Sequence, residues 1–305
     1  MWFMLWTAWE FFHGSFYCHI SVHTFAPPFH TSRKSFFVCE NSWFYLYTIK
    51  RRDMKKVLKV IGVLIMLGIV AAGIVWWYSR TSNPWNAKTI GDVPAPVGYT
   101  RVEGSYAEFM RKLPLKKCGS RVQLYTGGDA GLQWLSAGVV DIPVLSNSEQ
   151  CADMTMRVRT EYLFRQGRYS EIRFQDVNGH TLQYHGGSSH KALEKYLKNA
   201  YGVCSTFSVS RETESRPVSE VQPGDVLVYP ARKMRGMGHA LIVVDVARKG
   251  KKVAVMCAEG NTPARELHIV RNLNPVENPW FFFDGDEGTL WVSVFHFGKN
   301  ELRHY

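Results

Sequence analysis

The sequence lacks the residue spacing of a structural zinc site. Its six cysteines include no Cys-x-x-Cys pair, and its histidines form no cluster with metal-ligand spacing. Internal repeats and low-complexity tracts are also absent. With 305 residues, of which 46% are hydrophobic, the chain is long enough for one or two globular domains. We therefore expect an ordinary globular part that uses no metal and no cofactor.

A strong basic surplus is missing from most of the chain. The formal net charge is +11, but the residues from Thr81 onward hold 28 Lys and Arg against 23 Asp and Glu, so only +5 belongs to them. The basic cluster at 248–252 is centred on Gly250 between two β-rich runs, which is typical of a solvated hairpin turn. We expect no nucleic-acid partner.

Charge is wholly absent from a run of 20 residues, Val60–Ser79. About 20 apolar residues are needed to cross a bilayer. Lysines precede the run and aromatic residues close it, so the positive-inside rule and the aromatic belt place the C-terminal part outside the cytosol. We expect residues 54–80 to form a transmembrane helix or signal anchor whose residues 60–79 cross a bacterial inner membrane once. The C-terminal domain would then lie in the periplasm.

A cleaved signal peptide is the alternative interpretation of this run. The run is longer than the roughly 7 to 15 residues of an ordinary signal core, and it ends in Trp76-Trp77-Tyr78, not in a small-residue cleavage site. No cysteine follows the run closely, which disfavours a lipoprotein anchor.

Residues 1–53 do not resemble a folded domain. They contain 16 of the 42 aromatic residues and show no amphipathic period. Because Met54-Lys55-Lys56 is by itself an ordinary start of an export signal, we interpret residues 1–53 as a disordered extension produced by a wrongly assigned gene start. An aromatic tail on the membrane surface is the alternative.

The exported part is expected to contain a Pro-rich linker over residues 81–97 and an α+β domain over residues 98–305. Helical periodicity and capping signals predict helices over 105–113, 148–165 and 188–201. Asn178-Gly179 predicts a hairpin, and β-rich runs predict antiparallel or mixed strands in the C-terminal half. The segment 205–210 is a poor helix former, and Asp245 is expected in a turn.

One histidine begins a β-rich run in this half. The order is Pro223-Gly224-Asp225-Val226, then Gly238-His239-Ala240, then Glu259-Gly260-Asn261. A histidine at a strand end, beside polar side chains of the next strand, suits proton transfer. Alternatively, His239 has only a structural role and forms a hydrogen bond with a backbone carbonyl.

These motifs resemble the second half of the CHAP family, papain-like amidases and peptidases that cut cell-wall peptides. The resemblance implies a papain-like fold in which His239 is the general base and Glu259 or Asn261 orients it. By position it makes Cys204 the nucleophile, since a thiol needs a neighbouring imidazole to become a thiolate. Three alternatives remain open, because Cys204 is also compatible with burial or with a disulfide to Cys257, and Ser205 or Thr206 could replace the thiol.

The exported region as a whole resembles an uncharacterised family of bacterial envelope proteins, domain of unknown function 4846. The matching segments are Leu113-Pro114-Leu115-Lys116, Cys151-Ala152-Asp153, residues 156–163, Pro223-Gly224-Asp225-Val226 and Gly238-His239-Ala240. This resemblance implies an envelope location and leaves the activity unassigned.

Three charged residues of the helix predicted over 148–165 lie close together: Arg157, Arg159 and Glu161. Charges on a half-buried helix need partners, so they are candidates for polar recognition of a ligand, although a solvated face is the plainer alternative. Two functions follow. The first is a cysteine amidohydrolase that acts on peptidoglycan peptides. The second is a non-catalytic module that binds peptidoglycan or an envelope protein in the same groove.

Overall fold

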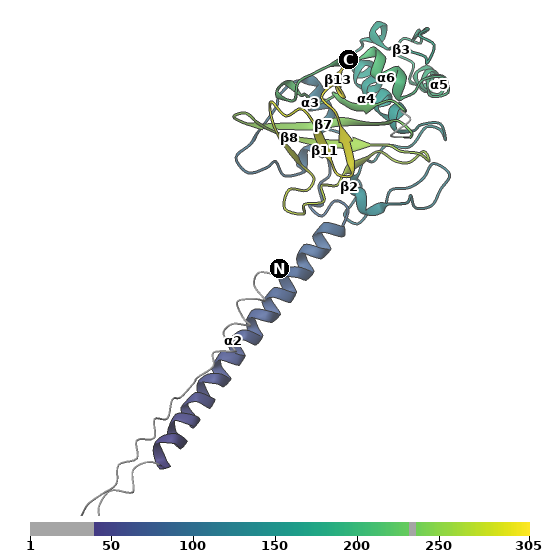
Figure 1. Cartoon of the computed structure of the whole chain (residues 1–305). Helices are drawn as coiled ribbons and strands as arrows, with labels where there is room; N and C mark the ends of the chain where they lie inside the picture. The colour runs from purple at the N-terminus through teal and green to yellow at the C-terminus, as the bar shows by residue number, and fades with distance from the viewer. Residues whose placement is uncertain (1–39, 232–235) are drawn as a thin grey trace, which may run out of the picture. The chain divides into compact units, whose positions relative to one another are not determined.

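The computed structural model describes the backbone of residues 40–231 and 236–305 and nearly all side chains from Met54 onward (Figure 1). The expected N-terminal extension falls outside the described residues as far as residue 39, and residues 40–53 belong to a helix. Contacts within the chain separate it into two units, residues 1–65 and 66–305.

A single long helix, α2 (Glu40–Arg80), runs through the boundary of these units. Its stretch Met54–Tyr78 is long and apolar enough to cross a membrane. Leu64 and Ile69 are each 61% exposed within the structure, and a helix that is apolar on all sides needs lipid or protein around it. The prediction of one helix with the length and composition of a membrane span is confirmed. Its orientation remains a prediction.

The other described α-helices are α3 (Ser105–Arg111), α4 (Cys151–Arg165), α5 (His190–Tyr201) and α6 (Thr206–Glu212). The first three confirm the predicted helices to within three residues at each end. Helix α6 shows that the poor-helix prediction for 205–210 was wrong. The Ser205 hydroxyl caps it by accepting a hydrogen bond from the Phe207 N–H at 3.1 Å, and Val209 is fully buried. Capping and burial therefore outweigh weak propensity here.

The strands lie mainly in the C-terminal half, as expected. They are β1 (Thr100–Arg101), β2 (Ser136–Val139), β3 (Arg173–Gln175), β4 (Thr181–Gln183), β5 (Glu214–Ser215), β6 (Val226–Tyr229), β7 (His239–Lys249), β8 (Lys252–Glu259), β9 (His268–Val270), β10 (Phe281–Asp284), β11 (Leu290–Val292), β12 (Phe295–Phe297) and β13 (Leu302–His304). Every pairing between described strands is antiparallel. The fold is α+β.

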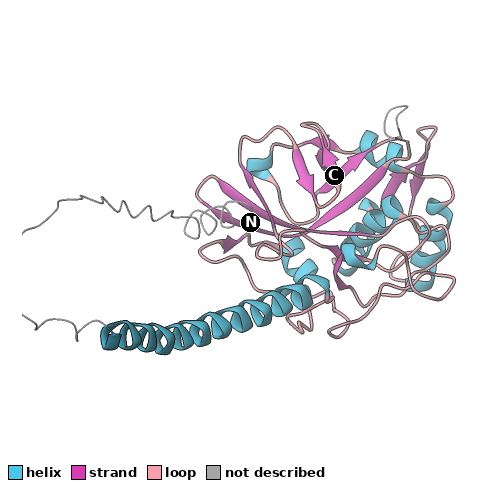
Figure 2. Cartoon of the chain, turned by 60° about the horizontal axis from the view of Figure 1, so that its bottom comes forward, coloured by secondary structure: helices cyan, strands magenta, loops and turns pink. Residues whose placement is uncertain are grey.

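The main sheet has the order β2-β9-β8-β7-β6-β13-β5, with β1 also paired to β7 and β10 also paired to β8. The helices of the domain gather against one part of this sheet (Figure 2). The hairpin predicted at Asn178-Gly179 forms between β3 and β4, and the turn predicted at Gly250 joins β7 to β8.

Strand β7 separates two layers of core. Ala240 and Ile242 pack with residues of the helices, whereas Leu241 and Val243 pack with the strands on the other face. This alternation is the period of two that a strand buried on both faces produces. The sheet is thus covered on both sides, and His239 begins its central strand.

The segment expected as a linker, residues 81–97, instead packs against the domain. Asn83 and Ile90 are fully buried, and Val93 is 1% exposed. The Asn83 side chain donates to the carbonyls of Ala87 and Lys116, both at 2.8 Å. Apolar side chains among its prolines and polar residues therefore supply core contacts, which the Pro-rich composition had obscured.

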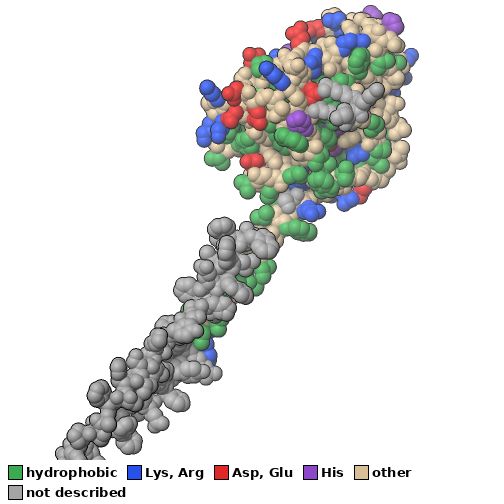
Figure 3. Space-filling model, viewed as in Figure 1, with side chains coloured by type: hydrophobic (Ala, Val, Ile, Leu, Met, Phe, Trp, Pro, Cys, Tyr) green, Lys and Arg blue, Asp and Glu red, His purple; other side chains and the backbone are tan. Residues whose placement is uncertain are grey.

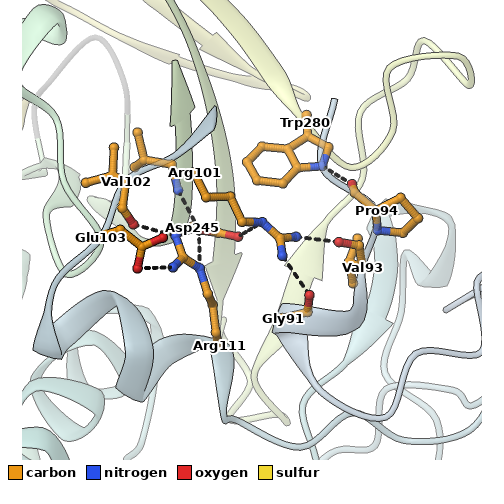
Figure 4. A network of polar contacts seen from close by, with 10 residues as sticks. Gly91, Val93, Pro94, Arg101, Val102, Glu103, Arg111, Asp245 and Trp280 are labelled. Carbon is orange, nitrogen blue, oxygen red and sulfur yellow. Dashed lines mark hydrogen bonds and ion pairs between the residues drawn. The ribbon is translucent and has the colours of Figure 1, made fainter. Parts of the chain in front are cut away.

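Asp245, expected in a turn, lies within β7 and is completely buried. Arg111 and Arg101 each bring a guanidinium nitrogen to 2.9 Å from its carboxylate (Figure 4). Arg101 also donates to the carbonyl of Gly91 at 2.7 Å, and Arg111 donates to that of Val102 at 2.5 Å. The network ties residues 91–111 to the central strand. The pairing of β7 with β8 shifts register between Val243 and Asp245.

Candidate active site

His239 and Glu259 meet at one end of the two central strands. His239 is the first residue of β7 and Glu259 is the last residue of β8, so antiparallel pairing brings them together. The Nε2 atom of His239 lies 2.5 Å from Oε2 of Glu259. The side chains are 8% and 1% exposed. A buried pair of this kind is strong because little water competes for it.

Cys151 is the first residue of α4, which packs against β7. Its thiol lies beside the imidazole of His239 and helps to raise the pKa of that group. Three elements therefore bring together a thiol, an imidazole and a carboxylate. The start of a helix also carries a partial positive charge, which favours an anion there.

The electrostatics of the imidazole and the carboxylate favour their charged forms. Burial alone would lower the pKa of His239, but its hydrogen bonds with Cys151 and Glu259 raise it to about 9. Burial alone would raise the pKa of Glu259, but hydrogen bonds from His239 and His268 lower it to about 2. At neutral pH the imidazole is thus mostly protonated and the carboxylate ionised. An imidazolium is the partner that a thiolate requires.

A second histidine, His268 of β9, holds the other oxygen of the carboxylate. Its Nε2 lies 3.2 Å from Oε1 of Glu259, and its Nδ1 lies 3.1 Å from the backbone oxygen of Glu266. Glu259 and His268 are direct cross-strand partners in the pairing of β8 with β9. The carboxylate is therefore fixed between two imidazoles.

Phe295 of β12 covers the ring of His239. The two rings are stacked, with centroids 4.3 Å apart and an angle of 22° between their planes. An aromatic face in this position keeps water from the hydrogen bond between His239 and Glu259 and restricts rotation of the imidazole.

The residues around the thiol are polar and ordered. The Gln150 side-chain oxygen accepts a hydrogen bond from the Thr262 hydroxyl at 2.9 Å, which fixes the amide beside Cys151. The Gln150 N–H donates to the carboxylate of Asp153 at 2.9 Å. Burial raises the pKa of Asp153 to about 7, against the effect of that hydrogen bond. The start of α4 thus presents amide donors and a carboxyl group close to the thiol.

Gly238 explains why glycine precedes the histidine. A Cβ atom there would lie 2.2 Å from the Thr206 hydroxyl and 2.8 Å from the Tyr229 backbone oxygen. No side chain fits between α6 and the start of β7 without a shift of backbone. Glycine therefore permits the close approach that places His239.

The structure pairs His239 with Cys151 where the sequence had suggested Cys204. The thiol of Cys204 donates to the Gln175 carbonyl at 3.4 Å, and none of the contacts described for it includes His239. Burial, reinforced by the charge of Glu212, raises its pKa to about 12. That environment disfavours a thiolate. Physically, Cys204 sits between α5 and α6, where no histidine faces it in the described contacts.

The disulfide alternative and the hydroxyl alternatives also find no support in this geometry. Among the described residues, Cys118, Cys151, Cys204 and Cys257 are free thiols. Ser205 caps α6, and the Thr206 hydroxyl lies against Gly238.

Of the two candidates for the orienting group, Glu259 takes the position beside the imidazole. Asn261 lies two residues beyond β8, and its side-chain oxygen accepts a hydrogen bond from the Thr262 N–H at 2.7 Å. That contact shapes the turn after β8 and leaves the imidazole to Glu259.

Each of the three charged residues of α4 has a separate partner in the fold. Arg157 is buried, donating to Glu149 at 3.1 Å and to the Pro143 carbonyl. The guanidinium of Arg159 lies 4.4 Å from the ring centroid of Tyr305. Glu161 is 3.5 Å from His190. Each charge has its own partner in the fold, so a shared recognition surface remains only a prediction.

Sequence reasoning missed Cys151, His268 and Phe295. The signal for Cys151 was its place in the first turn of the most strongly predicted helix, a position that suits a reactive thiol.

The described residues include no group of three or more His, Cys, Asp or Glu side chains arranged to hold a metal ion.

Comparison with known proteins gives one match. The family model for Domain of unknown function (4846) matches residues 91–186 and 183–304. No curated protein and no solved structure matches the chain. The matched segments span α3 and α4, the sheet and the site built by Cys151, His239 and Glu259. Since the match covers more than half of the sequence, the chain belongs to the family Domain of unknown function (4846).

Proposed function

We propose that this domain is a cysteine amidohydrolase or peptidase, with Cys151 as nucleophile, His239 as general base and acid, and Glu259 as the group that orients the imidazole. One observation carries the proposal. The imidazole of His239 lies beside a thiol at a helix start and forms a hydrogen bond with a buried carboxylate, and the three groups come from three separate elements. A nucleophile, a base and an orienting group in this order make a catalytic triad.

The chemistry is acyl transfer from an amide. The Cys151 thiolate attacks the carbonyl carbon, and the resulting oxyanion accepts hydrogen bonds from the N–H of Cys151 and from the side-chain amide of Gln150. Protonated His239 then gives its proton to the leaving amine, and a thioester remains. Water, deprotonated by His239, attacks the thioester and releases the carboxylic acid with the free thiol. Glu259 keeps the imidazole in place throughout.

The proposed substrate is the peptide part of peptidoglycan, and the proposed site of action is the bacterial cell envelope. Support comes from the apolar stretch Met54–Tyr78 and from the lysines that precede it, which favour an exported domain anchored in the inner membrane. A papain-like, CHAP-like relationship is part of the same proposal. A helix-borne thiol packed on a strand-borne histidine supports it.

The test is release of soluble peptide fragments from purified peptidoglycan by the full chain in detergent under reducing conditions. We expect release by the unaltered protein and by Cys204→Ala, and none by Cys151→Ala or His239→Ala. Cys204→Ala is the matched control, because it removes a partly buried thiol outside the triad. Release that survives Cys151→Ala would refute the proposed nucleophile. Binding of peptidoglycan without release would favour the non-catalytic module.

A further inference from the structure

The end of α2 shares an open hollow with a loop of the domain. This hollow, of about 520 Å³, is lined by Trp76 and Arg80 of α2, by Arg121 and by residues 130–134. A second hollow beside it is lined by Arg80, Trp134 and residues 271–273. All of these residues belong to the unit 66–305. The last turns of the apolar helix and these two loops therefore face a common space.

Hydrogen bonds fix the loops 130–134 and 271–273 beside the C-terminal end of α2. Buried Arg271, at the end of β9, donates to the carbonyl of Thr81 at 2.9 Å. The Asn83 N–H donates to the carbonyl of Ala137 in β2 at 2.5 Å. The residues that follow α2 are thus hydrogen-bonded to the edge of the sheet formed by β2 and β9, from which the two loops extend.

The length of the apolar helix places this edge relative to a bilayer. Met54–Tyr78 has 25 residues, about 37 Å at about 1.5 Å for each residue, whereas the hydrocarbon core is about 30 Å thick. An untilted helix of this length reaches the headgroup layers with both ends. Trp76 is two residues from its end, and tryptophan prefers that layer. Side chains that line a hollow with Trp76 lie at the same depth.

The loops carry the side chains that such a layer accepts. Leu132 is 62% exposed, Trp134 is 41% exposed and Leu273 is 51% exposed. Arg80 and Arg121 stand beside them, and guanidinium groups bind phosphates well. Hydrophobic and basic side chains meet where the domain joins α2 (Figure 3). In water this exposure of apolar surface is unfavourable, whereas in a headgroup layer it is stabilising.

We propose that Leu132, Trp134 and Leu273, with Arg80 and Arg121, form a membrane-seating face that rests in the phospholipid headgroup layer of the bilayer that α2 spans. The face holds the domain against the membrane in one orientation through lipid contacts that add to those of the spanning helix. This inference does not depend on the chemistry of Cys151.

Photo-crosslinking of the full chain in liposomes of phosphatidylethanolamine and phosphatidylglycerol tests it. The photoreactive analogue p-benzoyl-phenylalanine replaces Leu132 or Trp134 in separate variants. Val177 is the matched control, because it is 44% exposed and follows β3, which lies away from the end of α2 (Figure 1). Leu64, within the apolar stretch, is the positive control. Mass spectrometry of the irradiated peptides detects lipid adducts.

We expect lipid adducts at positions 64, 132 and 134 and only the unirradiated background at position 177. Adducts at 64 without adducts at 132 and 134 would overturn the seating face. Crosslinks from 132 or 134 to a second copy of the chain would overturn it in favour of a protein contact. Absence of adducts at 64 would show that α2 is not in lipid, and the inference would fail with it.

Discussion

Raising the pH should remove the stability that His239 contributes to the folded domain. The pKa of this buried imidazole is raised from 6.5 to about 9 by Cys151 and Glu259. A group whose pKa is higher in the folded state stabilises that state fully below its unfolded pKa, and the contribution is lost as the pH rises through the folded value. The loss should therefore fall between about pH 6.5 and about pH 9.

The magnitude follows from the same values. At roughly 1.4 kcal/mol for each pH unit, the contribution of His239 is about 3 kcal/mol, as an upper figure. Glu259 works in the opposite direction, because its lowered pKa stabilises the fold above about pH 4.5 and the contribution disappears as the pH falls toward about 2. One interaction produces both effects, so the two must not be added. The pair should be most stabilising between about pH 4.5 and about pH 6.5.

Thermal unfolding of the full chain in detergent, monitored by near-UV circular dichroism, measures the stability of the domain at about pH 6 and about pH 9. The variant His239→Gln should lose much less stability between the two conditions than the unaltered protein. His180→Gln serves as control, since His180 is a largely exposed histidine. Equal pH dependence in the protein and in His239→Gln would refute the reasoning.

Three further predictions test other contacts. Asp245→Ala should destabilise the domain by about 3 to 5 kcal/mol, because it leaves two largely buried arginines without their carboxylate, and chemical denaturation will measure the change. If the domain has the proposed peptidase activity, His268→Asn should lower the rate of peptide release by about tenfold or more and move its alkaline pH limit, since the carboxylate that orients the imidazole loses one partner. An unchanged pH profile with reduced stability would leave His268 a purely structural role. Iodoacetamide near neutral pH should leave Cys204 largely unmodified, because its pKa of about 12 leaves almost no thiolate, and peptide mass spectrometry will measure the extent of alkylation.

Local patterns in the sequence identify much of this fold. The helical period before Pro114, the Asn178-Gly179 turn and the β-rich runs around Gly250 each depend on neighbours a few residues away. They give the helices, the hairpins and the position of His239 at the start of a strand. Local patterns do not predict helix α6, because its stability comes from a serine cap and buried side chains, which intrinsic helix propensity does not include.

The rest of the site depends on pairings between distant segments. His268 reaches Glu259 only because β8 and β9 pair in the register that sets the two residues opposite each other. Asp245 is buried because arginines of the 101–111 region fold onto β7. His268 lies in the strand that follows Glu259, whereas Arg111 and Asp245 are 134 residues apart. A single sequence contains the side chains of these contacts but not the register that joins them.

Chain order also explains why the sequence points to Cys204. Between α4 and β7 the chain inserts the hairpin β3–β4, the helices α5 and α6, and strands β5 and β6. Cys204 is the cysteine nearest upstream of His239, yet it lies within that insertion, between α5 and α6. Helix α4 comes before the insertion and returns in space to pack on β7 with its first residue beside the imidazole. A nucleophile for a strand-borne histidine should therefore be sought at the start of the helix that covers that strand. Proximity in sequence is a poor guide when other elements lie between the two.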